Sequence, residues 1–118
     1  MRGTSNPLSI LSRKELTWTS TRLLTLWKWM SDMCSMIMKK AWTSRAQRAP
    51  SVNFANAVKT NPTVGAIHLT NMVPAQGGLP IMVGDDVIGA IGVSGAPGGD
   101  KDEVCAKAGI DKVAADLK

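Results

Sequence analysis

The stretch that decides the fold is Gly77-Gly78-Leu79-Pro80-Ile81-Met82-Val83-Gly84-Asp85-Asp86-Val87-Ile88-Gly89-Ala90-Ile91-Gly92-Val93-Ser94. Two mainly apolar runs, 79–83 and 87–94, flank a short turn made of one glycine and two aspartates. This arrangement is typical of a β-hairpin, because such a turn lets the chain reverse between two strands. The two runs are therefore expected to pair as antiparallel strands.

The second of these strands carries its smallest side chains on one face. Ile88, Ala90, Gly92 and Ser94 share that face, which narrows toward the end of the strand. A glycine inside a strand weakens it unless another group must approach the backbone closely. That group could be a packed helix or a flat ligand. The residues alone favour the helix and leave the ligand open.

The loop 94–99 leads into the N-terminus of a predicted final helix, 101–117. Asp100 is a suitable N-cap, and Glu103 lies three residues later, as a capping box requires. The free N–H groups of a helix N-terminus could bind a carboxylate or a phosphate. Asp100, Asp102 and Glu103 already place negative charge there, which favours a structural turn over an anion site. The buried stripe of the helix is expected to be Val104, Ala108, Val113 and Leu117.

The residues upstream of the hairpin are less regular. Residues 1–22 are expected to form a poorly ordered arm, and the Trp-rich run 23–30 is expected to be a strand. The spacing of apolar residues in 35–47 predicts a helix, which Pro50 ends. A second short helix is expected from a Ser51 cap through residue 59. Its buried face is expected to be Phe54, Ala55 and Val58.

Length and composition restrict the class of protein. The chain has 118 residues, of which 44% are hydrophobic and 19% charged, as expected for one globular domain. Residues 1–60 hold ten Lys/Arg and two acids, whereas residues 61–118 hold four Lys and seven acids, so their net charges are +8 and −3. No nucleic-acid-binding motif accompanies the basic residues. We therefore expect neither a nucleic-acid partner nor a membrane span. We expect the protein to be located in the cytoplasm.

The residues that commonly carry catalysis are sparse. One histidine cannot build a multi-histidine metal site within a single chain, and Cys34 and Cys105 form no CxxC motif. The segment around Ser94 lacks the second glycine of a GxSxG elbow. No catalytic residue is therefore assigned, and enzymatic activity is left open, with a non-enzyme favoured.

Two further features could serve a ligand. His68 is flanked by Ile67 and Leu69, where a lone histidine is more often a hydrogen-bonded residue than a ligand. A neutral imidazole could nevertheless take an axial position on haem iron. A set of Trp and Met residues could line a pocket for a planar ligand, or form core or an oligomer interface: Trp27, Trp29, Met30, Met33, Met36, Met38 and Trp42.

The segments 77–81, 87–97, 99–103 and 105–110 together resemble the GlcG/HbpS-like family of haem-binding proteins. A looser resemblance extends through 57–62 and 39–43. The resemblance implies an α+β fold in which helices flank an antiparallel sheet, with a C-terminal amphipathic helix, over residues 23–118. Relatives include haem-binding sensors, a subunit encoded beside glycolate oxidation genes, and a domain appended to corrinoid adenosyltransferases.

The resemblance implies haem or another tetrapyrrole as the cofactor, in a homo-oligomer that binds a small molecule. The expected iron ligand is His68. The residues expected to contact the cofactor are Gly77, Gly78, Gly92, Ser94, Gly95, Gly98 and Gly99. Two other functions remain open: a cofactor-free accessory subunit that binds a partner protein, and a protein that binds a small carboxylate at the glycine-rich loop.

The start of the chain departs from the family pattern. Relatives usually open with a long amphipathic helix and an apolar strand that ends in an Asp-x-Gly-Gly-type turn, and residues 1–22 supply neither. The chain is therefore expected to be truncated or divergent at its start. An exposed sheet edge, marginal stability and rescue by oligomerisation are expected to follow.

Overall fold

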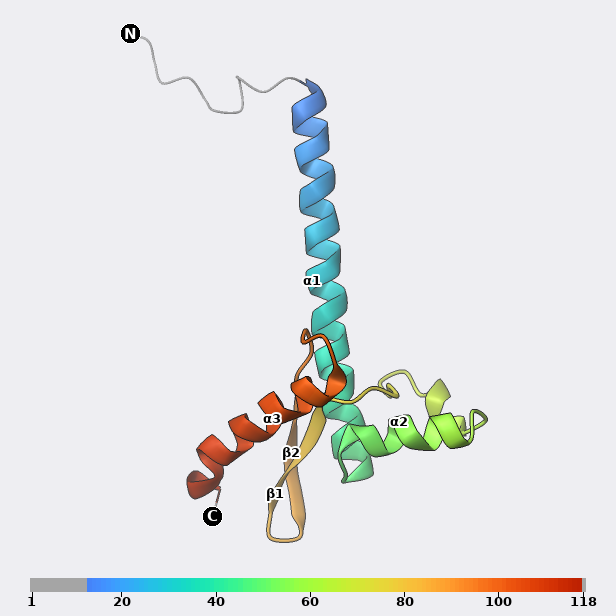
Figure 1. The fold of residues 1–118 in the computed structure, drawn as a ribbon, viewed down its shortest axis with the longest axis vertical. Helices are drawn as coiled ribbons and strands as arrows, with labels where there is room; N and C mark the ends of the chain where they lie inside the picture. Colours follow the sequence, from blue (N-terminus) through green and yellow to red (C-terminus); the bar gives the residue numbers. More distant parts are fainter. Residues whose placement is uncertain (1–12, 118) are drawn as a thin grey trace. The chain divides into compact units, whose positions relative to one another are not determined.

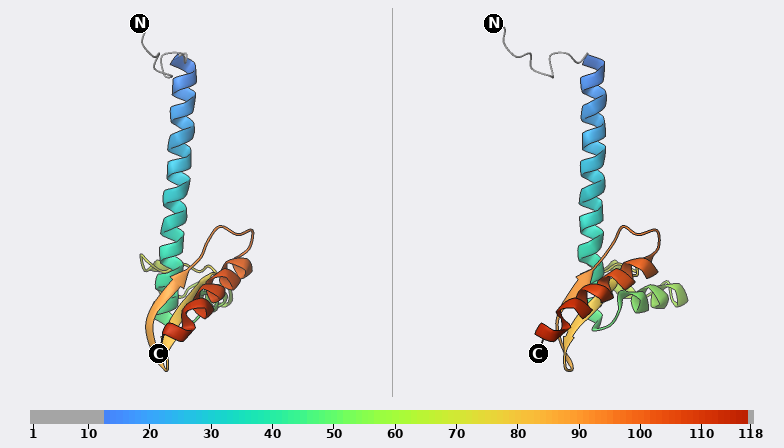
Figure 2. Two further views of the ribbon diagram at one scale, coloured as in Figure 1. Left: turned by 90° about the vertical axis from the view of Figure 1, so that its left-hand side faces the viewer. Right: turned by 60° about the vertical axis from the view of Figure 1, so that its left-hand side comes forward.

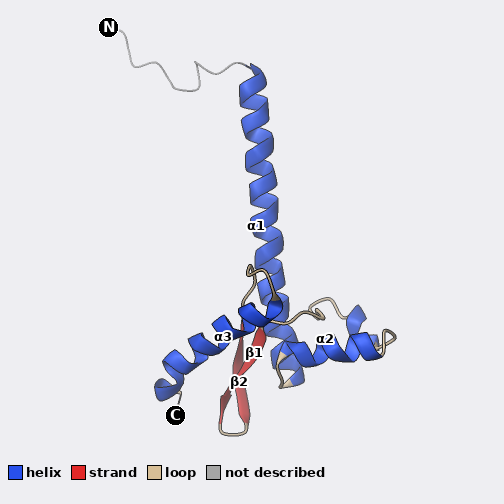
Figure 3. Cartoon of the chain, viewed as in Figure 1, coloured by secondary structure: helices blue, strands red, loops and turns tan. Residues whose placement is uncertain are grey.

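The computed structural model describes residues 13–117 of the chain and the side chains from residue 22 onward. The chain divides into two compact units, Met1–Asp32 and Met33–Lys118. Helices and a single antiparallel hairpin give the expected α+β class (Figures 1 and 3). The elements are α1 (Arg13–Gln47), α2 (Ser51–Thr60), η2 (Gly65–His68), β1 (Gly78–Val83), β2 (Asp86–Gly92), α3 (Gly99–Val113) and η3 (Ala114–Asp116).

Helix α1 corrects the prediction made for the Trp-rich run. Residues 23–30 were expected to be a strand, and they are helical, as are residues 13–22 of the expected arm. A run in which most residues are apolar can satisfy the strand period and the helix period equally well. No glycine or proline interrupts residues 13–47, and Leu, Met and Lys favour helices. The helix expected over 35–47 is confirmed as the last part of α1. Residues 1–12 lie outside the described part of the chain.

A tight turn separates α1 from α2. Arg48 adopts a φ of 55°, the left-handed conformation that commonly ends a helix. The amide of Ala49 donates to the carbonyl oxygen of Ser44 at 3.2 Å, and the Ser44 hydroxyl donates to the Ala49 carbonyl at 2.7 Å. Pro50 then disfavours further helix in the residue before it. The expected break at Pro50 is confirmed.

Helix α2 begins one residue earlier than a Ser51 cap would require. Its N-cap is Pro50, with no side-chain hydrogen bond. The hydroxyl of Ser51 is fully buried and instead accepts a hydrogen bond from the backbone N–H of Gly78 at 2.8 Å. The capping role predicted for Ser51 is therefore wrong. The expected buried face is found, with Phe54 and Ala55 buried and Val58 half-buried.

Replacing Ser51 with alanine should destabilise the Met33–Lys118 unit. The change leaves the N–H of Gly78 buried without an acceptor, which costs about 1–3 kcal/mol. Urea denaturation followed by far-ultraviolet circular dichroism would measure the loss. Thr60→Ala is the control, because that hydroxyl bonds the Asn56 carbonyl at the exposed end of the same helix. An equal effect of the two substitutions would contradict this assignment.

Strands β1 and β2 form the expected hairpin. Gly78 pairs with Gly92 at the open end and Val83 pairs with Asp86 beside the turn, with one register shift between Ile81 and Met82. Gly84 has a φ of 59°, which a tight reversal requires and which glycine adopts without strain. The hairpin prediction is confirmed.

Two helices cover opposite faces of the hairpin. A Cβ on Gly92 would overlap the carbonyl oxygen of Ile37, and a Cβ on Gly78 would overlap the carbonyl oxygen of Lys40, so α1 lies directly on these glycines. Ile91 faces the other way, and its Cδ1 would lie 3.3 Å from a Cβ on Gly109 of α3. Figure 2 shows α3 alongside the hairpin. The group that approaches the narrow strand face is thus a helix.

The inner face of α3 differs from the predicted stripe. Val104 is 70% exposed and Val113 is 43% exposed, whereas Asp102 and Ala106 are buried. Helix α3 also begins at Gly99 with Gly98 as N-cap and no side-chain cap, so the Asp100 cap is wrong. The spacing of apolar residues did not predict the buried face of α3. The buried ion pair of Asp102 with Lys40 sets the rotation of this helix about its own axis. Two further predicted stripe positions are exposed or half-buried: Ala108 and Leu117.

The core of the described chain is small and partly polar. Its buried hydrophobic side chains are Phe54, Ala55, Met72 and Ala106, and its buried polar ones are Lys40, Thr43, Ser44, Ser51 and Asp102. The hydroxyl of Thr43 accepts from the Val73 amide at 2.9 Å and donates to the Lys39 carbonyl at 2.8 Å. Specific hydrogen bonds therefore hold much of this unit together. Among the described residues, no helix is long and apolar enough to cross a membrane.

Candidate functional site

Three of the predicted glycines lie at the open end of the hairpin: Gly77, Gly78 and Gly92. Gly77 has a φ of 119°, and a Cβ there would lie 2.7 Å from the Val93 carbonyl oxygen and 3.0 Å from Lys40 Nζ. Gly78 and Gly92 pair across the strands. Gly77 and Ser94 lie beside the side chain of Lys40, and Gly78 lies against its backbone. These residues form one cluster with Gly92, around a lysine that the sequence did not single out.

Lys40 is the centre of this cluster. Its Nζ lies 2.9 Å from Asp102 Oδ2, 2.9 Å from the Val93 carbonyl oxygen and 3.3 Å from Ser94 Oγ. The other carboxylate oxygen of Asp102 accepts from the Ala96 amide at 3.0 Å. Both charged side chains are only 5% exposed. The pair ties α1, the end of β2 and the start of α3 to one another.

The pKa of Asp102 reflects these neighbours. Burial raises the pKa of the carboxyl group, but hydrogen bonds from Lys40 and from the Ala96 amide, together with the charge of Lys40, lower it more. The net pKa lies below the ordinary value of 3.8. Asp102 is therefore ionised at neutral pH and neutralises Lys40 within the fold.

The loop between β2 and α3 is shaped by contacts within the chain. The Gly98 carbonyl accepts from the amides of Lys101 and Asp102, and Gln76 Nε2 donates to Glu103 Oε2 at 2.9 Å. A Cβ on Gly99 would lie 2.8 Å from Gln76 Cβ, whereas the space beside Gly95 is open. The Ala96 amide already binds the Asp102 carboxylate. These contacts favour the structural turn over an anion site.

His68 lies apart from the contacts that join the glycine cluster. It is exposed at the end of the short helix η2. None of the hydrogen bonds or ion pairs around Lys40 involves it. Within residues 13–117, no group of three His, Cys, Asp or Glu side chains could hold a metal ion.

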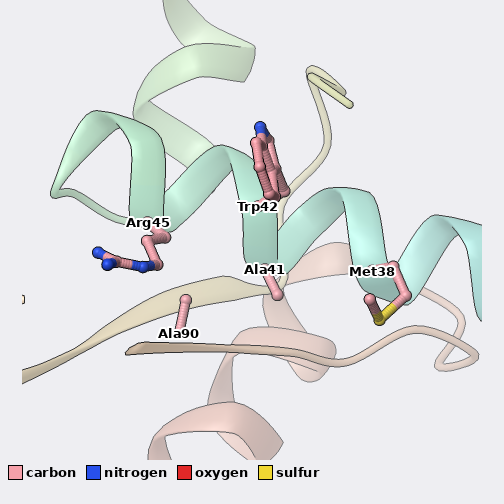
Figure 4. Close-up of a pocket in the computed structure, with 5 residues that line it drawn as sticks. All are labelled: Met38, Ala41, Trp42, Arg45 and Ala90. Carbon is pink, nitrogen blue, oxygen red and sulfur yellow. The ribbon is translucent and has the colours of Figure 1, made fainter. Parts of the chain in front are cut away.

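A second candidate site lies where α1 crosses the hairpin. Three open hollows of about 290, 200 and 160 Å³ surround Trp42, which is 57% exposed. Figure 4 shows Ala41 directed toward the strands, Met38 and Arg45 on either side of it along the helix, and Ala90 on the facing strand. We call these hollows the Trp42 surface, and its residues are Met38, Lys39, Ala41, Trp42, Arg45, Ala46, Asn71 and Ala90.

The chemistry of the Trp42 surface suits a flat ligand with acidic groups. Trp42 offers a flat aromatic face, and Met38 offers a polarisable thioether one turn earlier. Lys39 and Arg45 lie three residues before and after Trp42, which places one cation about 60° to each side of Trp42 around the helix. Arg45 Nη1 also donates to the Val87 carbonyl oxygen at 3.2 Å, which holds its side chain beside β2.

The sequence indicated this surface only in part. Met38 and Trp42 belong to the Trp and Met set proposed for a planar ligand. Lys39, Arg45 and Ala90 were missed, because their roles depend on where α1 crosses β2. Other members of the set, Trp27, Trp29 and Met30, lie in the first unit and are exposed.

Known proteins share this part of the chain. The family described as haem degrading protein HbpS-like matches residues 28–111. A relative from Citrobacter freundii, described as an uncharacterized 15.0 kDa protein in the dhaT-dhaS intergenic region, is 32% identical over 81 residues, which are 66% of this chain and 56% of that protein.

Solved structures agree with the family match. The crystal structure of HbpS is similar with a TM-score of 0.61 and 30% identity, covering 67% of this chain and 55% of that one. Klebsiella pneumoniae protein ORFY is similar with a TM-score of 0.61 and 28% identity, covering 70% of this chain and 58% of that one. The chain thus spans little more than half the length of these relatives. The matched residues include the hairpin, α2 and most of α3, and the chain belongs to the HbpS-like family of haem degrading proteins.

Proposed function

We propose that this chain binds haem or a closely similar tetrapyrrole on the Trp42 surface. The observation that carries the proposal is the exposed Trp42 with a cation three residues away on each side. A porphyrin ring could stack on the indole while its propionates approach Lys39 and Arg45. Membership of a family described as haem degrading supports the ligand class.

The residues present fit this ligand in chemistry and only partly in size. Pockets that enclose a small molecule usually measure about 300–1,000 Å³, and each hollow here is smaller and open. One chain would therefore cover one face of the ring. The proposal accordingly includes a second copy of the chain that covers the other face. Sedimentation velocity with and without haem would detect that assembly.

Bound haem would supply an iron atom for ligand binding or redox chemistry. Met38 would offer the iron a thioether sulfur, and His68 would offer it an imidazole. Among the predicted contact glycines, Gly95 is the one beside which space is open, so we propose that it and Ser94 approach the ligand. Gly77, Gly78, Gly92, Gly98 and Gly99 would act by shaping the backbone that supports the site. The proposed location is the cytoplasm.

Haem titration followed by absorbance tests this function. The intact protein should give a saturable, shifted Soret band. Trp42→Ala should weaken binding about tenfold, because losing an aromatic stack of up to about 1.5 kcal/mol corresponds to that factor. Trp29→Ala is the matched control, since Trp29 is 58% exposed and Trp42 is 57% exposed.

The outcomes of this titration separate the possible sites. If the Trp42→Ala variant and the intact protein bind haem with equal affinity, the haem site lies outside the Trp42 surface. Uptake that never saturates would contradict the function itself. Met38→Leu and His68→Ala would each change the position of the Soret band only if the substituted residue is an axial ligand.

A further inference from the structure

The first unit carries a broad apolar surface on helix α1. Six large apolar side chains between residues 22 and 32 are more than half exposed, from 54% for Met30 to 72% for Trp27. No other described element presents so many in so short a span. We call this set the apolar arc, and its residues are Leu23, Leu24, Leu26, Trp27, Trp29 and Met30.

The apolar arc covers more than half of the helix surface. At about 100° per residue, its six side chains span roughly 220° of the circumference, with Leu23 and Met30 near the centre. Leu24 and Trp29 lie at the two margins. Thr25, Lys28 and Asp32 occupy the opposite face, where Lys28 and Asp32 form an exposed ion pair at 3.2 Å.

The width of the apolar arc argues against a single partner helix. A seam between two helices needs a stripe narrower than about 100°, so a second helix would leave the marginal Trp29 or Leu24 uncovered. A bilayer surface can accept a wide apolar face, and tryptophan favours the level of the lipid headgroups. The arc is too short for a span, which suits a helix that lies along the surface.

Charge identifies the kind of bilayer. Residues 1–32, the unit that includes the apolar arc, hold five Lys/Arg and two acids, which gives a net charge of +3. An anionic lipid surface attracts this basic unit. We propose that residues 22–32 of α1 bind the surface of an anionic bilayer, with the apolar arc inserted among the headgroups and acyl chains.

Vesicle binding by the full chain tests this proposal without haem. Vesicles of phosphatidylglycerol mixed with phosphatidylcholine should bind the protein and shift its tryptophan emission to shorter wavelength. Vesicles of phosphatidylcholine alone should bind it at least tenfold more weakly, because they lack the electrostatic attraction. Added salt should reduce binding to the anionic vesicles.

Two variants locate the contact. The double substitution Leu23→Glu and Met30→Glu should lower partition into anionic vesicles at least tenfold, because it places charge at the centre of the apolar arc. Val104→Glu on α3 is the control, since Val104 is 70% exposed and lies outside the arc. Trp29→Ser provides a milder second variant and should also weaken binding.

Three outcomes would overturn the proposal. The first is that the protein does not bind anionic vesicles, and the second is that the arc and control variants weaken binding equally. The third is that the protein does not bind vesicles but self-associates in a concentration-dependent way that the arc variant abolishes. The last outcome would assign the arc to a second copy of the chain. A failed haem titration would leave this proposal unaffected, because Trp42 lies outside the arc.

Discussion

Replacing Asp102 with asparagine is expected to lower the free energy of unfolding of the Met33–Lys118 unit by about 3–5 kcal/mol. The substitution leaves Lys40 charged and buried without its counter-ion, because the lysine side chain is only 5% exposed. An uncompensated buried charge is among the most costly changes a small domain can suffer. Since small domains are stabilised by about 5–15 kcal/mol, the substitution should remove a large share of the unit's stability.

A matched control lies on the same helix. Lys107 and Asp111 form an ion pair at 3.0 Å, but their side chains are 70% and 60% exposed. Asp111→Asn should therefore change stability by less than about 1 kcal/mol. Urea denaturation of both variants makes the comparison. Similar losses from the two substitutions would show that the buried pair has no special role.

The double variant Lys40→Met and Asp102→Leu distinguishes two contributions to stability. One is the destabilisation caused by an unpaired buried charge, and the other is the net stabilisation that the ion pair provides. Replacing both partners with apolar side chains is often neutral or stabilising, so much of the stability should return. If the double variant remained as unstable as Asp102→Asn, the hydrogen bonds to Val93 and Ala96 would be the dominant contribution.

The contribution of Asp102 should also depend on pH in a defined direction. Its pKa is lower in the folded chain than the ordinary value of 3.8, so the folded state favours the ionised carboxylate. The resulting stabilisation is present above the ordinary pKa and is lost as the pH falls through the folded pKa. The intact protein and Asp102→Asn should therefore converge in stability below pH 3.8.

Replacing Gly92 with alanine should cost about 1–3 kcal/mol of stability. The new Cβ would overlap the Ile37 carbonyl oxygen and lie 3.0 Å from the Ala41 amide nitrogen, so α1 would have to move away from β2. The same movement would separate Ala41 from Ala90, because Ala41 is the α1 side chain directed toward the strands (Figure 4). Haem affinity should therefore fall along with stability.

Gly89→Ala provides the comparison within the same strand. A Cβ on Gly89 would meet only Ile81 Cδ1, at 3.8 Å, which is ordinary van der Waals contact. This variant should keep its stability within about 0.5 kcal/mol, as an unstrained substitution usually does. A similar loss at both glycines would show that helix packing is not the reason for glycine at position 92.

The sequence predicted those elements of the fold that depend on residues close together in the chain. The turn Gly84-Asp85-Asp86 between two apolar runs was enough to predict the hairpin, and the helix spacing in 51–59 was enough to predict the burial of Phe54 and Ala55. The narrow face of β2 correctly indicated a close neighbour. That neighbour proved to be α1.

The errors arose where a distant residue decides the outcome. In the sequence, Asp102 is one of several acidic residues in the first turn of a predicted helix. Its neighbours in the sequence do not indicate that it forms an ion pair with Lys40. Ser51 resembles a helix cap until the amide of Gly78 is seen beside it. The run 23–30 satisfied both strand and helix periods. The Trp42 surface likewise needed the crossing of α1 over Ala90, which sequence spacing does not encode.

Nuclear magnetic resonance with gallium protoporphyrin, a diamagnetic analogue of haem, tests the central claim most directly. A porphyrin stacked on the Trp42 surface should shift the methyl resonances of Met38, Ala41 and Ala90 upfield through its ring current. The methyl resonances of Ala106 and Val113 on α3 should stay unchanged. Saturable upfield shifts confined to the first group would confirm the site. Saturation with shifts on α3 alone, or no saturable shift at all, would contradict it.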